Sequence, residues 1–100
     1  MNITINKLQY KVKFVDRISV DTDNSCIGWF DSETQIIEIK KSLSKLQRRR
    51  TFLHELTHAF VWAYGFNDVD FNKETISNFV SNYFDEMQKI LKMFDTIYNK

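Results

Sequence analysis

A run of five residues, His54-Glu55-Leu56-Thr57-His58, carries the side chains best suited to chemistry. It has the form H-E-x-x-H, which binds zinc when it lies on a helix. At 100° per residue the two histidines lie about 40° apart on the helix surface, so both imidazoles can hold one ion. Glu55 lies about 100° from His54, on the flank of that face. The spacing predicts two zinc ligands and a general base that takes a proton from a water activated by the metal.

A catalytic zinc ion usually has three protein ligands and keeps one position for water. The chain has two histidines and both lie in the motif, so the third ligand must be a carboxylate or, less favourably, Cys26. We predict Glu74, because it lies in the first turn of an expected helix, where the helix dipole favours an anion, and on the polar face of that helix. Asp68, Asp70 and Asp85 also follow the motif and are the other candidates for a carboxylate ligand.

Two of these interpretations have plainer alternatives. Asn78, one turn after Glu74, can orient a zinc-bound imidazole through a hydrogen bond, or it can be an ordinary solvated residue. The two histidines can likewise be structural residues with hydrogen bonds of their own. Their helical phase argues against burial in the core, because the apolar residues of the same helix point to the opposite side.

Two long helices must position these residues, over about 45–64 and 73–98. Ser44 and Gln47 have the spacing of a capping box, and leucines and aromatic residues then recur at helical spacing up to Gly65, a typical C-terminal cap. Asn72 can cap the second helix, which continues as one long apolar stripe.

The segment before the helices predicts strands. Residues 8–15 alternate apolar with polar side chains, which predicts a strand. Residues 26–30 and 35–39 are two further runs of strand length, and the turn between them predicts a hairpin. We therefore expect one domain over residues 1–100 with an α+β fold, in which a small antiparallel sheet of three strands, about 8–40, precedes the two helices. Because zinc peptidases commonly bind substrate as an added strand, we expect residues 35–40 to provide the receiving edge.

The motif and its surroundings resemble the ImmA/IrrE-type metallopeptidases, in particular their short versions from phages and mobile elements. The resemblance covers most of residues 26–85 and includes the hairpin, the run from Thr51 to Phe60, and Glu74 followed by Asn78. It implies a minimal gluzincin fold, zinc held by His54, His58 and Glu74, and Glu55 as catalytic base. The sequence departs from the family pattern at Thr57, where a glycine is usual, and at Val80, where an alanine is usual.

Charge and composition limit the class of protein and the compartment in which we expect it. With 14 basic and 13 acidic residues the net charge is +1, so the chain lacks the strong positive charge that is typical of a dedicated nucleic-acid binder. The one basic cluster, residues 40–50, is interpreted as a solvated helix start, with binding of an acidic substrate or of nucleic acid as the alternatives. A single cysteine, the lack of a signal-like N-terminus and the lack of a long apolar run lead us to expect a cytoplasmic protein without a membrane partner.

These observations favour a zinc-dependent peptidase that acts on a protein or peptide substrate, such as a regulator or repressor. The alternative is a non-catalytic module that binds zinc and serves protein interaction. The two hypotheses differ in one measurable property, the hydrolysis of a peptide bond that depends on Glu55.

Overall fold

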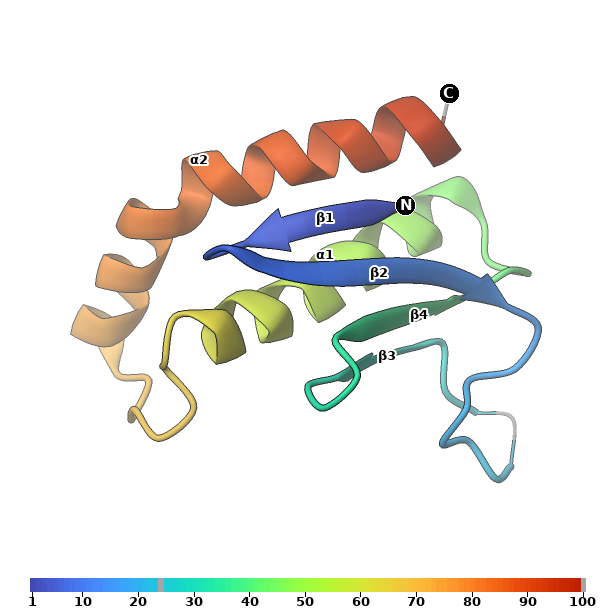
Figure 1. The fold of residues 1–100 in the computed structure, drawn as a ribbon, viewed down its shortest axis with the longest axis horizontal. Helices are drawn as coiled ribbons and strands as arrows, with labels where there is room; N and C mark the ends of the chain where they lie inside the picture. Colours follow the sequence, from blue (N-terminus) through green and yellow to red (C-terminus); the bar gives the residue numbers. More distant parts are fainter. Residues whose placement is uncertain (24, 100) are drawn as a thin grey trace.

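The structure, a computed structural model, describes residues 1–23 and 25–99. Four strands are followed by two helices: β1 (Asn2–Ile5), β2 (Leu8–Val15), β3 (Gly28–Asp31), β4 (Ile36–Lys40), α1 (Lys45–Ala63) and α2 (Lys73–Tyr98). Figure 1 shows this order along the chain. The α+β class is confirmed.

The sheet differs from the prediction in two respects. It has four strands in the order β1-β2-β4-β3, and β2 pairs with β4 in parallel while the other two pairs are antiparallel. β1 was missed because it is only four residues long; Asn6 and Lys7, both at positive φ, connect it to β2 through a two-residue turn. The loop that precedes β3 brings that strand to the far side of β4, so β2 and β4 become neighbours that run in the same direction.

The helix predictions hold almost to the residue. The Ser44 side chain accepts a hydrogen bond from the Gln47 backbone N–H at the start of α1, and Asn72 does the same for Thr75 at the start of α2. After α1, Gly65 has φ +76°, the left-handed conformation expected of a glycine that ends a helix. Neither helix, in the part of the chain that the structure describes, is long and apolar enough to cross a membrane.

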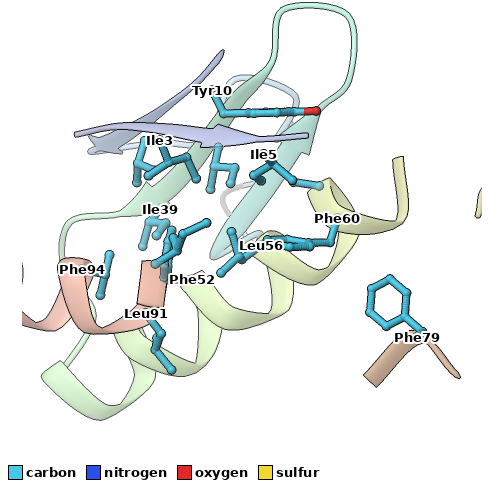
Figure 2. Packing of buried hydrophobic residues seen from close by; sticks show 14 residues of the cluster. Ile3, Ile5, Tyr10, Ile39, Phe52, Leu56, Phe60, Phe79, Leu91 and Phe94 are labelled. Atoms are coloured by element: carbon cyan, nitrogen blue, oxygen red, sulfur yellow. The ribbon is translucent and has the colours of Figure 1, made fainter. Parts of the chain in front are cut away.

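The core lies between α1 and the sheet. Phe52, Leu56 and Phe60 are fully buried, and Figure 2 shows Leu56 and Phe60 pointing from α1 toward the strand that carries Ile5. α2 packs on α1 at more than one place: the Phe52 and Phe94 rings stack with centroids 4.2 Å apart, and the Tyr83 ring lies 6.3 Å from that of Phe60. This packing fixes the buried side of α1, and the opposite side remains free for polar side chains.

Candidate functional site

His54 and His58 lie one turn apart on α1, and both side chains are exposed. Their Nε2 atoms are 3.3 Å apart. Two nitrogens that bind one zinc ion at about 2.0–2.1 Å with a tetrahedral angle are separated by about 3.3 Å. The pair therefore already has the spacing of two ligands of one tetrahedral ion, and the predicted orientation away from the core is confirmed.

Glu55 has a different environment from the histidines. Only 6% of the residue is exposed, and its Oε2 atom is buried without a hydrogen-bond partner. Burial raises the pKa of the Glu55 carboxyl, and the charges of His58 and His54 oppose this effect. Its ligating oxygen and the two imidazole nitrogens lie within 4.8 Å of one another. A buried acceptor without a partner, next to two imidazoles, fits a group that bonds a water or a metal ion there.

Gly28 of β3 explains how Glu55 becomes buried. A Cβ atom built on Gly28 would lie 2.5 Å from Thr51 Cγ2 and 3.3 Å from Glu55 Cγ. The missing side chain thus lets the edge of the sheet approach α1 directly beside the carboxylate. The sequence carried a signal for this contact, since a glycine inside a strand often marks a close approach of backbone.

Two hollows lie between β3 and α1, and Glu55 lines both. The basic hollow, about 440 Å³, lies on the His54 side and is lined by Ile27, Gly28, Gln47, Arg50, Thr51 and His54. The aromatic hollow, about 500 Å³, lies on the His58 side, and its lining includes Trp29, Phe30, Val61, Trp62 and Asn67. Residue numbers rise in the same direction along β3 and α1, so the two hollows follow one another along this contact and share Glu55; together they are called the trough.

The remaining predicted site residues lie elsewhere. Glu74 is in the first turn of α2, as predicted, but it is exposed and does not belong to the cluster of His54, Glu55 and His58. Asn78, one turn further, is also exposed. Cys26 is half-buried and its backbone N–H donates to Asp21, outside the cluster. Within residues 1–23 and 25–99, that cluster is the one group of three or more potential ligands close enough to share an ion.

An apolar groove of about 580 Å³ runs between α1 and α2, and its lining extends from Phe71, just before α2, to Leu91 in the second half of that helix. Thr57 and Val61 line it from α1, and Phe71, Ile76 and Val80 line it from the segment around the start of α2. The groove lies next to the histidines, because Val61 also lines the aromatic hollow.

The prediction that residues 35–40, which contain β4, provide the edge that receives the substrate is wrong. β4 is paired on both sides, with β2 and with β3, so it has no free edge for an added strand. β3 is one of the two edge strands, and it is the one beside the histidines. Chain order alone had suggested the last strand before the helix, and the parallel pairing of β2 with β4 reverses that assignment.

The basic cluster of residues 40–50 serves the fold in part. Arg48 donates to the Tyr98 carbonyl at the end of α2, Arg49 forms an ion pair with Asp95 at 3.0 Å, and Lys41 forms a long, exposed one with Asp16. Arg50 is exposed and, among the residues that the structure describes, has no hydrogen bond or ion pair. These roles were not predictable from the run of charges.

Comparison with known families agrees with this geometry. The model of the M78 peptidases, described as the IrrE N-terminal-like domain, matches residues 1–94. The chain therefore belongs to this family of metallopeptidases, and the resemblance noted in the sequence is confirmed. No curated protein and no solved structure matches it.

Proposed function

We propose that the protein is a zinc-dependent peptidase that hydrolyses a peptide bond in a protein or peptide substrate. The observation that carries this proposal is the buried, unpartnered Glu55 carboxylate beside two imidazole nitrogens spaced as ligands of one ion. Zinc bound at His54 and His58 would lower the pKa of its water toward about 7 and polarise the substrate carbonyl. Membership of the M78 family supports the same chemistry.

Glu55 acts as the general base in this proposal. Its raised pKa, caused by burial, makes the carboxylate a stronger proton acceptor than an exposed glutamate. The same side chain can then return the proton to the leaving amine. Gly28 lies close to the Glu55 side chain, since a Cβ atom there would come within 3.3 Å of Glu55 Cγ, so the edge of the sheet helps to bury this base.

Glu74 remains our proposal for the third ligand. It is the acidic residue of the first turn of α2, and the M78 family match extends across it. Because Glu74 lies outside the cluster, coordination requires its exposed side chain, or the start of α2 that carries it, to move toward the two histidines. The groove that runs between α1 and α2 is lined by Ile76 close to Glu74 and leaves space for such a movement.

The substrate is proposed to lie along β3. This strand pairs with β4 on one side only, and extended peptides commonly bind to such an edge through main-chain hydrogen bonds. A peptide there passes the basic hollow, Glu55 and the aromatic hollow in sequence.

Zinc content and peptide hydrolysis test the proposal together. The wild-type protein should bind one zinc ion per chain and cleave a mixture of fluorescently labelled peptides, and His54→Ala should lose both properties. Leu46→Ala is a control at a 59% exposed position of the same helix and should retain both. Zinc binding without hydrolysis would support the non-catalytic alternative, and a protein without zinc affinity would overturn both.

A further inference from the structure

The two ends of the trough differ in charge. At the His54 end Arg50 adds a positive charge beside Gln47 and Thr51. At the His58 end the additional lining is Trp29, Phe30, Val61 and Trp62 with the uncharged Ser32 and Asn67. Glu55, common to both hollows, contributes no difference between them. A substrate that lies along the trough therefore meets a cation on one side of the reacting position and aromatic side chains on the other.

The guanidinium of Arg50, unlike those of Arg48 and Arg49, has no partner among the described residues. Arg49 pairs with Asp95 through two hydrogen bonds, and Arg48 donates to the backbone at the end of α2. Arg50 has no such contact among the described residues, and it lies one helical turn before His54 in the same hollow. Its guanidinium is thus free to bind a carboxylate by donating two parallel N–H hydrogen bonds to it.

The aromatic hollow at the His58 end offers uncovered apolar surface to a substrate. Trp62 is 43% exposed although it is a large aromatic residue, and Trp29 and Phe30 are half-buried beside it. Exposed tryptophan gains most from a partner that covers its ring with apolar atoms. Apart from Glu55 and His58, which belong to the proposed reacting position, the residues that line this end are uncharged.

We propose that the trough selects peptides with an acidic side chain on the His54 side of the cleaved bond and a large apolar side chain on the His58 side. Arg50 is the residue that determines the acidic preference. This inference rests on the proposed function, because it names the substrate class of that site. The preference of each hollow for one kind of side chain can be measured by peptide binding, so the inference can be tested separately from catalysis.

The probe is a pool of short peptides with randomised sequences, used in two ways. Zinc-loaded protein digests one sample, and mass spectrometry of the new termini gives the residues on both sides of each cut. Immobilised Glu55→Gln protein retains peptides from a second sample, which reports binding without cleavage. An exposed ion pair is worth up to about 1 kcal/mol, so Asp and Glu should be enriched about two- to fivefold over Asn and Gln on the Arg50 side.

The informative variant is Arg50→Glu, which should remove the acidic preference and favour Lys and Arg instead. Lys92→Glu changes the net charge equally at an exposed position of α2 outside both hollows, and it should leave the preference unchanged. The preference should also weaken in 1 M salt, where the screening length falls to about 3 Å.

The outcomes separate the inference from the proposed function. Cleavage with no acidic preference, or with one that survives in Arg50→Glu, overturns the inference and leaves the peptidase activity in place. Retention of acidic peptides that Arg50→Glu abolishes, without any cleavage, supports the inference and overturns the activity. A pool that is neither cleaved nor selectively retained overturns both.

Discussion

Gly28 of β3 contacts Thr51 of α1 so closely that a Cβ atom on the glycine would lie 2.5 Å from Thr51 Cγ2. No side chain fits in this space, and the contact holds the edge of the sheet beside Glu55. The approach of β3 to α1 thus depends on one residue without a side chain. The close approach of β3 contributes to the burial of Glu55, the proposed general base, and places β3 beside α1 along the trough.

Gly28→Ala should therefore destabilise the protein by about 1–3 kcal/mol, the usual effect of overpacking a tight contact. Chemical denaturation measures this change. Thr51→Ser removes the Cγ2 atom that an alanine would strike, so Gly28→Ala should cost less in a Thr51→Ser background. Equal losses in the two backgrounds would show that the contact does not limit the approach of the strand.

Phe94 anchors α2 on the core, since its ring stacks on Phe52 at an interplanar angle of 6° and both residues are fully buried. Phe94→Ala should lower the free energy of unfolding by about 3–5 kcal/mol. Ile97→Ala, at a 52% exposed position of the same helix, should change it by less than about 0.5 kcal/mol. Similar losses from both variants would contradict the observed packing of α2.

Asp21 gives the protein a predictable dependence on pH. Burial acts to raise the pKa of this carboxyl, but hydrogen bonds led by that from the Cys26 N–H outweigh it and lower the pKa to about 2 from an ordinary 3.8. A folded-state pKa below the unfolded one stabilises the protein above pH 4, and this contribution is lost as the pH falls toward 2. Asp21→Asn should melt at a lower temperature than the wild type at pH 7.

The difference in melting temperature between wild type and Asp21→Asn should shrink as the pH falls from about 4 to about 2. Asp16→Asn is the matched control, because the Asp16 side chain is 90% exposed and forms only a 3.7 Å ion pair with Lys41. It should change the melting temperature little at any pH. A difference for Asp21→Asn that does not depend on pH would mean that the carboxylate charge is not what stabilises the loop.

Glu74→Gln tests the third ligand. Loss of a direct ligand should weaken zinc binding by more than the roughly 10–100-fold typical of outer partners of a metal site. Asp85→Asn removes an acidic group from another exposed position of α2 and should leave zinc affinity unchanged. Competition with a zinc-sensitive dye gives both affinities. Equal affinity of Glu74→Gln and wild type would exclude Glu74 as a ligand.

The helices and the histidine face were predictable because they depend on local patterns. Ser44, Asn72 and Gly65 mark the helix ends through their own backbone preferences, and helical phase alone separates His54 and His58 from the core. These features need no knowledge of distant contacts.

The order of the strands was not predictable in the same way. The parallel pairing of β2 with β4 depends on how the chain crosses between them, and no local pattern records it. The short strand β1 did carry a signal, the alternation of Ile3 and Ile5 before a turn at Asn6. The role of Arg50 follows only when the contacts of Arg48 and Arg49 are known.

The most direct measurement of the central claim compares hydrolysis rates of Glu55→Gln and wild type at equal zinc occupancy. The variant keeps His54 and His58, so it should bind zinc, and it loses the general base. Its rate of peptide hydrolysis should therefore fall by roughly 10²–10⁴-fold. A Glu55→Gln protein that binds zinc and hydrolyses peptides as fast as the wild type would contradict the proposed mechanism.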